Sequence, residues 1–175
     1  MPQHRRRIYI VGFNKEIANQ AKARFKWPRK HKNKVGIGQF VESHHIGYSI
    51  SKHLQKSYIY KKDDGRPQVI DENSDIQVKT LCSTYHKIQR LTGTFVKDGE
   101  TGLRLLSHNE CKAIMGFPKD FKFPVSRTQM YRQMGNAVAI PVVEAIAKEM
   151  IKVLDMTTKK LEGAICSDKL MTISN

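Results

Sequence analysis

The sequence predicts an α/β fold that combines part of a covered sheet with a small, mostly β region. Residues 8–13, IYIVGF, form a continuous apolar run rich in β-branched and aromatic side chains, which is typical of a strand buried on both faces. Residues 37–104 contain short mixed segments separated by turn signals. Residues 107–116 and 141–154 have apolar side chains at helical spacing.

The strongest compositional signal is charge. The chain of 175 residues has 31 Lys and Arg against 16 Asp and Glu, a formal net charge of +15. Such an excess repels itself within one compact domain, so a polyanion, and nucleic acid first, is the natural partner. The alternatives are a soluble basic protein with a solvated face and, less favoured, a protein of anionic membrane surfaces.

Other compositional features exclude several classes. No run approaches the roughly 20 apolar residues of a membrane-spanning helix, and the charged first residues do not form a signal peptide. The 3 cysteines lack CxxC spacing, which argues against a disulfide framework or zinc ribbon and indicates a reducing cytoplasm. The adjacent pair His44–His45 is interpreted as part of a surface loop, and no metal site is predicted.

The N-terminal arginines precede the first predicted strand directly. Because alternate residues of a strand face the same way, Arg5 and Arg7 would share one face. Two parallel guanidiniums can clamp a phosphate, a carboxylate or a base carbonyl oxygen. A disordered basic tail is the alternative, but such a tail seldom runs straight into a buried strand.

A basic arm follows the strand. Residues 14–25 predict a turn and a short helix, and residues 21–36 contain many Lys and Arg, no acid and a central Pro. In the next region, segments such as SYIYKK and TGTFVKDG alternate with turn signals at Asp64–Gly65, Asp71–Asn73 and Asp98–Gly99. Short segments separated by turn signals predict small antiparallel strands and loops with little helix.

Two helices are predicted near the C-terminus. Ser107 and Glu110 form a capping box, and Gly116 stops that helix. Pro141 suits the first turn of the second helix, whose pattern fades beyond Asp155, where fraying is expected. Its apolar stripe comprises Val143, Ile146, Ala147, Met150, Ile151 and Leu154. The pair Gly135–Asn136 is interpreted as a turn before this helix, where free backbone N–H groups could bind a ligand.

Together these segments resemble DNA (cytosine-5)-methyltransferases. PQHRRRIYIVGF resembles the family's Gln-x-Arg-x-Arg motif, RLLSHNECKAIMGFPKDFKF its ninth motif and YRQMGNAVAIPVVEAIA its tenth. VKTLCSTYHKIQRLTGTFV is similar to the recurrent part of the family's target-recognition region, with Thr80–Leu81 and Gly93 in place. The resemblance covers about residues 2–154 in the family's order.

The resemblance implies the C-terminal portion of a Rossmann-like methyltransferase domain plus a small, mostly β target-recognition domain. Residues 1–20 would be a strand segment of the catalytic domain. Residues 21–128 would be the target-recognition domain with the ninth motif, and residues 129–156 would return to the catalytic domain. Residues 157–175 would be a tail.

The departures from the family are also informative. The sequence has no glycine-rich S-adenosylmethionine loop, no Pro-Cys nucleophile and no Glu-Asn-Val acid motif; Cys82, Cys111 and Cys166 all lack a preceding Pro. The start methionine falls directly before Pro-Gln. We therefore expect a complementary methyltransferase subunit, carrying the missing motifs, to supply the remaining strands, and this chain to be inactive alone.

The family's mechanism assigns roles to the matching residues. A thiolate attacks carbon 6 of a cytosine flipped out of the duplex, and methyl transfer from S-adenosyl-L-methionine to carbon 5 follows. By resemblance, Arg7 would contact the base carbonyl oxygen, and Arg5 would order the pocket or hold the adjacent phosphate. Asn136, Ala137 and Val138 would line the cofactor cleft or brace the arginines.

DNA contact would fall to residues 21–104. Thr80, followed by Leu81, resembles the family's threonine that meets the DNA backbone beside the flipped base. Residues 82–92 would form a base-reading loop, and Arg66 would belong to a second loop. The candidates for base contact in the first loop are Lys87, Gln89 and Arg90. The basic arm would bind phosphates without specificity.

The first hypothesis is therefore the DNA-recognition subunit of a split methyltransferase from a bacterial restriction–modification system. The alternative is a truncated module that binds DNA without a catalytic role, and a basic structural protein is a third reading. The first hypothesis also predicts that residues 8–13 and the helix at 141–154 lack sheet neighbours and expose an apolar face.

Overall fold

The computed structural model describes residues 1–15, 17–19, 24–29 and 34–171, with side chains through residue 156. The chain divides into two compact units. The first consists of Met1–Arg6 and His31–Pro141, and the second of Arg7–Lys30 and Val142–Asn175. The predicted domain boundaries at residues 20, 128 and 156 differ from this division and stay predictions.

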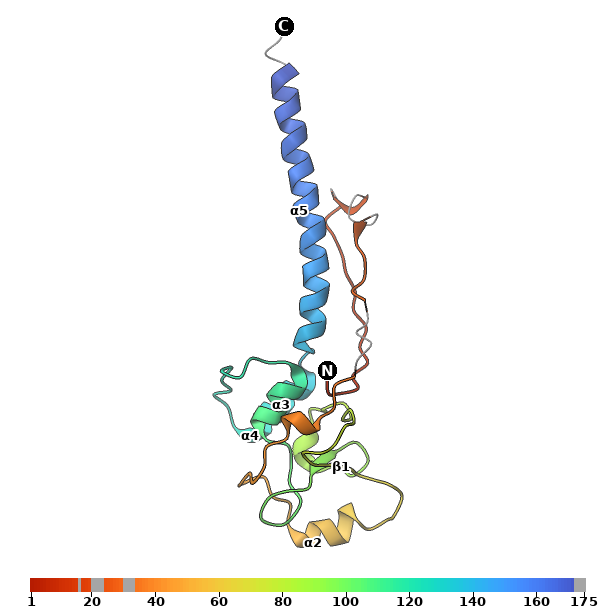
Figure 1. Ribbon diagram of the computed structural model, residues 1–175, viewed down its shortest axis with the longest axis vertical. Coiled ribbons are helices and arrows are strands. Elements are labelled where there is room, and N and C mark those ends of the chain that lie inside the picture. The colour runs from red at the N-terminus through yellow and green to blue at the C-terminus, as the bar shows by residue number, and fades with distance from the viewer. Residues whose placement is uncertain (16, 20–23, 30–33, 172–175) are drawn as a thin grey trace. The chain divides into compact units, whose positions relative to one another are not determined.

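The first unit contains short helices and a two-stranded sheet (Figure 1). Its strands are β1, Gln68–Ile70, and β2, Thr94–Val96. Its helices are η1 (Gly38–Phe40), α2 (Lys52–Leu54), η2 (Gln55–Ile59), η3 (Tyr85–Lys87), α3 (His108–Met115) and α4 (Arg127–Asn136).

The prediction of antiparallel strands is wrong for the named pair. β1 and β2 pair in parallel, with Val69 opposite Phe95. The long connection between them leaves room for the crossover that parallel pairing needs. Antiparallel pairing in the described residues is confined to isolated bridges, in which Arg104 lies opposite Ser49 and Val96.

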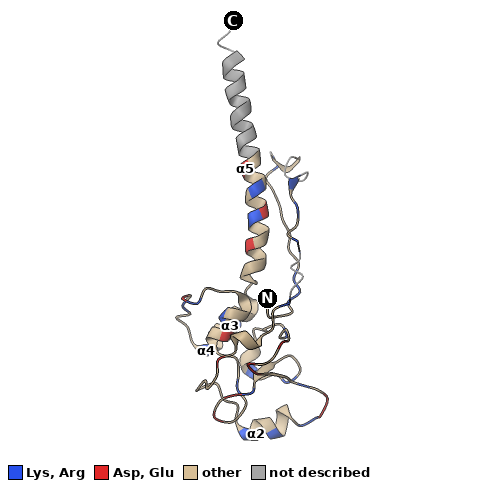
Figure 2. Cartoon of the chain, viewed as in Figure 1, with Lys and Arg blue, Asp and Glu red and all other residues tan. Residues whose placement is uncertain are grey.

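The first half of the SYIYKK segment is helical rather than extended, and the second half forms a turn. The Ser51 side chain caps α2 by accepting a hydrogen bond from the Leu54 backbone nitrogen at 3.3 Å. α2 runs into the π-helix η2, in which Ile59 is buried and Tyr58 is exposed, and Tyr60 at the C-cap is exposed as well. The cap and the burial of Ile59 override the β-propensity of the tyrosines. Figure 2 shows basic but no acidic positions on this stretch.

The capping prediction for α3 is confirmed. The Ser107 hydroxyl accepts from the Glu110 backbone nitrogen at 3.1 Å, and the Glu110 carboxylate accepts from the Ser107 nitrogen at 2.6 Å. Gly116 ends the helix with a φ of 77°, in the left-handed region that favours glycine. α3 and α4 pack against each other, so their buried Ile114, Met115 and Met134 contribute to the core of this unit.

The second unit holds the N-terminal apolar run and most of α5, Ile140–Met171. The prediction of a buried strand at residues 8–13 is wrong here: this run forms no ladder, and Ile8 and Ile10 are 90% and 92% exposed. A strand needs a neighbour, and the described residues supply none to this run.

α5 is longer than predicted. Its backbone stays helical through Met171 because the sequence beyond Asp155 has no Pro and only one Gly to interrupt it. Val143, Ile151 and Leu154 of its predicted apolar stripe are exposed, as expected for a face without sheet neighbours. No described helix is both long and apolar enough to cross a membrane.

The basic arm at residues 21–36 and the short helix predicted at 14–25 lie partly outside the described residues. Within the described part, Phe13 contacts Phe25 edge-on with ring centroids 5.9 Å apart. Phe25 in turn contacts Trp27 at 5.2 Å. The arm therefore returns to the apolar run through aromatic contacts.

Candidate functional site

The guanidinium of Arg5 joins three segments that are distant in the sequence. Its Nη1 donates to the Leu81 carbonyl oxygen at 3.1 Å. Its Nη2 donates to the carbonyl oxygens of Gly135 at 2.8 Å and Ala137 at 2.5 Å. A guanidinium presents its donors in one fixed plane, so these bonds tie the N-terminal segment, the Thr80–Leu81 dipeptide and the end of α4 into one site.

The segment that carries Arg5 is held by a parallel pairing. The His4 nitrogen donates to the Val78 carbonyl at 2.9 Å, and the Val78 nitrogen donates to the Pro2 carbonyl at 2.8 Å. Gln3 is buried between these bonds, and its side-chain amide donates to the Ile114 carbonyl at 3.2 Å. The first residues of the chain are therefore seated between residue 78 and α3.

Gly135 lets α4 approach the Cys82–Ser83 backbone. A Cβ on Gly135 would lie 2.1 Å from the Ser83 nitrogen and 2.3 Å from the Cys82 carbonyl carbon, a separation that no side chain could occupy. The prediction that Gly135–Asn136 forms a turn is wrong, because these are the last two residues of α4. Ala137 is the C-cap, and α5 begins at Ile140.

The predicted cofactor residues lie at this helix end. Asn136 is exposed, Val138 is 45% exposed, and Ala137 is half-buried with its carbonyl bound to Arg5. Asn136 and Val138 can therefore meet a ligand, while Ala137 braces Arg5. Arg7 is exposed and belongs to the second unit, so its predicted pairing with Arg5 stays a prediction.

The hydroxyl of Thr80, which is predicted to contact DNA, is hydrogen-bonded within the protein. Its hydroxyl donates to the His4 carbonyl oxygen at 2.6 Å. A phosphate oxygen can only accept a hydrogen bond. In the predicted DNA contact, the Thr80 hydroxyl would therefore donate to the phosphate instead of to the His4 carbonyl oxygen. Thr80 is half-buried, which leaves it accessible for such an exchange.

The loop at residues 82–92 is firmly anchored. Tyr85 of η3 is buried, and its hydroxyl donates to the Thr94 carbonyl at 2.5 Å and accepts from the Leu106 nitrogen at 3.0 Å. Ile88 has a φ of 52°, a left-handed conformation that is rare for a β-branched residue. Lys87 is exposed beside it, and the Gln89 side-chain oxygen accepts from Thr92 at 3.1 Å.

The contacts of Arg90 within the protein use most of the donors that its predicted role as a base reader would need. Its guanidinium is buried and donates to the carbonyl oxygens of Ile59 and Lys62, each at 2.8 Å. It also forms an ion pair with the Asp64 carboxylate, with one contact of 2.9 Å, and this hydrogen bond lowers the pKa of Asp64. With most of its donors used, Arg90 braces the turn at residues 59–64 and leaves little for a base edge.

The second predicted DNA loop is open to solvent. Gly65 has a φ of 68°, with no atom within 4 Å of a Cβ placed there. The Arg66 side chain is exposed, and its backbone nitrogen donates to the Asp64 carboxylate at 3.1 Å. Arg66 and Lys87 are thus the exposed cations among the predicted base-contacting residues.

An ion-pair cluster that sequence reasoning did not identify supports this unit. Arg104 is fully buried and makes two 2.8 Å bonds to the Glu110 carboxylate and one of 2.9 Å to Asp98. Although burial alone would raise it, the bonds to Arg104 and to backbone N–H groups hold the pKa of Asp98 well below its usual range. The sequence does contain a signal for this cluster. It is an Arg within the apolar run LRLL, six residues before the Glu of the capping box.

No group of three or more potential metal ligands occurs among the described residues. Among the described cysteines, burial raises the pKa of Cys111, and the thiol of Cys82 donates to the Thr80 carbonyl oxygen at 3.4 Å. The site at Arg5 thus consists of a guanidinium bound to backbone carbonyl oxygens, with the exposed residues Asn136 and Val138 beside it at the end of α4.

Comparison with known proteins shows the family to which the chain is related. The model of the C-5 cytosine-specific DNA methylase family matches residues 1–152. The Type II methyltransferase M.MspI of Moraxella sp is 62% identical over 151 residues, which are 86% of this chain and 35% of the relative. The Type II methyltransferase M.BsuFI of Bacillus subtilis is 55% identical, with 91% of this chain and 39% of the relative covered.

Solved structures support the same fold. The Dnmt2 methyltransferase of S. pombe aligns with a TM-score of 0.55 at 17% identity, covering 83% of this chain and 50% of that one. The Entamoeba histolytica methyltransferase EhMeth aligns with a TM-score of 0.53 at 19% identity, covering 72% and 46%. The predicted fold, part of a Rossmann-like methyltransferase, is confirmed. The chain spans well under half the length of the two bacterial relatives above, and it belongs to the C-5 cytosine-specific DNA methylase family.

Proposed function

We propose that this chain is the DNA-recognition part of a split DNA (cytosine-5)-methyltransferase of a restriction–modification system. The observation that carries the proposal is the three-way junction at Arg5, which joins the arginine motif to Thr80–Leu81 and to the end of α4. These are the three segments that must meet for a base pocket to adjoin a DNA-reading loop and a cofactor cleft.

The nucleophile and the general acid would come from a complementary polypeptide. The sequence contains no cysteine preceded by Pro and no Glu-Asn-Val motif. The exposure of Ile8 and Ile10, at 90% and 92%, supports a missing sheet neighbour, since large apolar side chains so exposed favour association.

Within such a complex, the arginines would divide their tasks. Attack of a thiolate on carbon 6 of the flipped cytosine moves negative charge toward the base carbonyl oxygen. Arg7, which is exposed, would meet that oxygen as a fixed cation. The bonds of Arg5 to three carbonyl oxygens favour its ordering role over its alternative role of holding a phosphate.

The cofactor of the proposed reaction is S-adenosyl-L-methionine, which supplies the methyl group when bound. The residues at the end of α4 fit one wall of its site, because Asn136 offers an exposed amide and Val138 an exposed apolar side chain. Ala137 would hold the wall in place through its bond to Arg5. The remaining walls would belong to the complementary polypeptide.

DNA would be held by the first unit. Lys87 and Arg66 are exposed cations on two loops and would reach base edges or phosphates. Thr80 would exchange the His4 carbonyl for a phosphate of the flipped nucleotide. The net charge of +15 would add salt-dependent affinity for the DNA backbone.

Reconstitution tests the proposal. The full chain is mixed with a polypeptide carrying the Pro-Cys and Glu-Asn-Val motifs, such as the part of the Moraxella relative that this chain does not match. Incorporation of a labelled methyl group into duplex DNA is then measured. Neither polypeptide should methylate DNA alone, whereas the mixture should, and Arg7→Ala in the mixture should lower the methylation rate by about a hundredfold or more.

Two outcomes separate this function from its alternative. A chain that binds duplex DNA but neither joins the complementary polypeptide nor supports methylation would be a DNA-binding module without a catalytic role. A chain that forms the complex but methylates equally well with Arg7→Ala would refute the assigned mechanism while keeping the split enzyme.

A further inference from the structure

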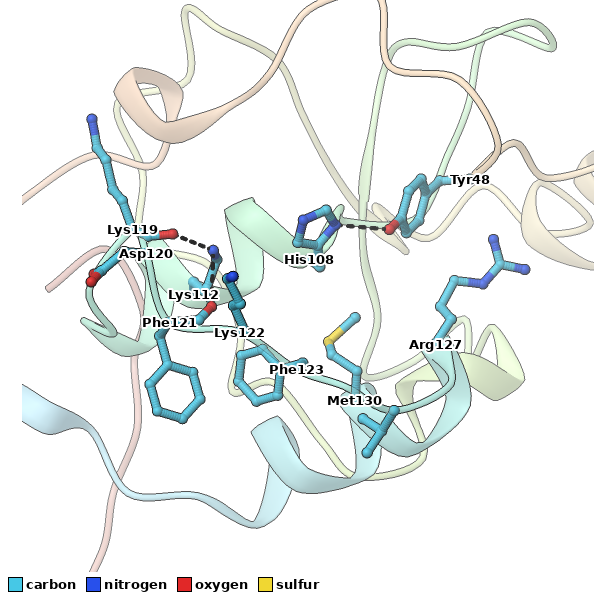
Figure 3. A pocket seen from close by; sticks show the side chains of 11 residues that line it. Tyr48, His108, Lys112, Lys119, Asp120, Phe121, Lys122, Phe123, Arg127 and Met130 are labelled. Carbon is cyan, nitrogen blue, oxygen red and sulfur yellow. Dashed lines mark hydrogen bonds between the residues drawn. The ribbon is translucent and has the colours of Figure 1, made fainter.

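A concave site separate from the junction at Arg5 lies in the first unit, between the start of α3 and the loop that leads to α4. The cavity has a volume of about 550 Å³, within the range of roughly 300–1,000 Å³ that is usual for small-molecule sites. Figure 3 shows its lining: His108 and Tyr48 on one side, Phe123 and Met130 below, and the 119–122 loop across from Arg127. None of these residues belongs to the junction at Arg5.

The lining of this cavity is strongly cationic. Four Lys and Arg side chains contribute to it, and Asp120 is the one carboxylate among the described residues that line it. These cations are Lys112, Lys119, Lys122 and Arg127. Such a concentration of one charge in a hollow focuses its field and attracts an anion.

Two of the four cations, Lys112 and Arg127, are bound to backbone carbonyl oxygens and so form part of the wall of the cavity. The Lys112 ammonium is buried and donates to the carbonyl oxygens of Lys119 at 2.6 Å and Phe121 at 3.3 Å. Arg127 lies over the Tyr48 ring, 5.3 Å from its centroid, and donates to the Gly47 carbonyl. Lys119 and Lys122 are exposed at the rim, where they can turn toward an incoming anion.

Aromatic rings supply the other half of the site. Phe121, between Asp120 and Lys122 in the sequence, is 44% exposed. Its ring is fixed by contacts with Phe117 and Phe123, each with centroids 4.9 Å apart. On the opposite side the Tyr48 hydroxyl is hydrogen-bonded to the His108 Nδ1 at 3.2 Å. A fixed and partly exposed ring beside exposed cations is the arrangement on which nucleic-acid bases stack.

We infer that this cavity binds a nucleoside phosphate, either free or as an unpaired nucleotide of a strand, with the base against Phe121 and the phosphate between Lys119 and Lys122. A cavity of this size admits one nucleotide and excludes a duplex. An acidic peptide fits less well, because the loop carbonyls that a peptide backbone would use are bound to Lys112. The inference requires neither methyl transfer nor a complementary polypeptide.

Fluorescence titration of the full chain tests this site. The probe is 1,N6-ethenoadenosine 5′-monophosphate, whose emission is quenched when its base stacks on an aromatic ring. The double variant Lys119→Gln with Lys122→Gln should weaken binding about tenfold or more, because two charge-assisted contacts are lost. The matched control is Lys52→Gln with Lys61→Gln, two exposed lysines outside the cavity, which should bind as the wild type does.

A second variant separates stacking from charge. Phe121→Leu keeps an apolar side chain and should retain phosphate-dependent binding while losing most of the quenching. Adenosine and inorganic phosphate should each compete far more weakly than adenosine monophosphate. Competition by a short single-stranded oligonucleotide, but not by duplex DNA, would assign the site to an unpaired strand; competition by the mononucleotide alone would assign it to a free nucleotide.

Three results would overturn the inference. Equal competition by inorganic phosphate would reduce the site to a simple anion site. Stronger competition by a glutamate-rich peptide would assign it to a protein partner. Unchanged affinity in the rim double variant, with an unchanged circular dichroism spectrum, would place nucleotide binding elsewhere.

Discussion

The α-carbon of Gly135 faces the backbone of Ser83 so closely that a Cβ on Gly135 would lie 2.1 Å from the Ser83 nitrogen. This approach lets the carbonyl oxygens of Leu81 and Gly135 bind the same guanidinium, that of Arg5. The glycine of the tenth motif therefore determines how closely α4 can approach the segment that carries Thr80. The geometry of the whole junction depends on this one missing side chain.

Gly135→Ala should disrupt that junction. The obstacle to the new methyl group is backbone, which cannot rotate away, so α4 must shift and the free energy of unfolding should fall by about 1–3 kcal/mol or more. Urea denaturation followed by circular dichroism measures the loss. Gly12→Ala is the control, because a Cβ at Gly12 has no atom within 4 Å; equal stability of the two variants would contradict the close approach.

Arg5→Ala should remove the bonds that hold the junction together. Three backbone carbonyl oxygens lose a charged donor, so we expect a destabilisation of about 2 kcal/mol or more. Arg5→Lys should recover only part of this, because an ammonium lacks the planar fork. Arg132→Ala, an exposed arginine of α4, should change the unfolding free energy by less than about 0.5 kcal/mol. A fully stable Arg5→Ala variant would show that the junction forms without it.

The sequence predicted the local signals of this fold well. The capping box of Ser107 and Glu110 and the stop at Gly116 depend on neighbouring residues alone, and all are present. The proximity of Arg5 to the tenth motif could be predicted only through the family resemblance, since nothing local links residues 5 and 135.

The errors have physical causes outside the local sequence. The apolar run IYIVGF has the composition of a strand, but a strand forms only where a neighbour accepts its hydrogen bonds. The sequence makes Arg90 a candidate for base contact, but it does not show that Asp64 and two backbone carbonyl oxygens bind the Arg90 guanidinium. Partners that lie 26 to 31 residues away cannot be read from charge pattern.

Glu110→Gln should be strongly destabilising. The change leaves the buried Arg104 guanidinium without its bidentate carboxylate, and breaking a buried pair in this way costs about 3–5 kcal/mol. The control is Glu149→Gln, which removes the 2.7 Å ion pair to the exposed Lys152 and should cost less than about 1 kcal/mol. Chemical denaturation of both variants gives the comparison; similar losses would mean that Arg104 does not depend on Glu110.

Acid should weaken the first unit through Asp98. The folded-state pKa of Asp98 lies below its ordinary value of 3.8, so its stabilisation is complete above that value and is lost as pH falls toward the lower folded value. As pH falls from about 4 toward about 2, the wild type should therefore lose stability more steeply than Asp98→Asn, which is less stable than the wild type at neutral pH. Asp155→Asn, at an exposed position of α5, should keep the wild-type slope. Parallel slopes for wild type and Asp98→Asn would contradict the Arg104–Asp98 bond.

Although Lys87 and Arg90 lie three residues apart, substitution of Lys87 should weaken DNA binding, whereas substitution of Arg90 should lower stability. Lys87 is exposed at the end of η3, so Lys87→Ala should leave the unfolding free energy within about 0.5 kcal/mol of wild type. It should also weaken duplex binding. If Lys87 contacts a phosphate, the slope of log affinity against log salt should fall by about 0.9. If it reads a base, only the preferred sequence should lose affinity.

Arg90→Ala should behave in the opposite way. Loss of the guanidinium leaves the carbonyl oxygens of Ile59 and Lys62 and the Asp64 carboxylate without their donor, so the unit should be destabilised by about 1–3 kcal/mol. At temperatures where the variant remains folded, its salt slope for duplex DNA should match that of the wild type, because the side chain faces the protein. A stable Arg90→Ala variant with a reduced salt slope would instead indicate that Arg90 contacts DNA.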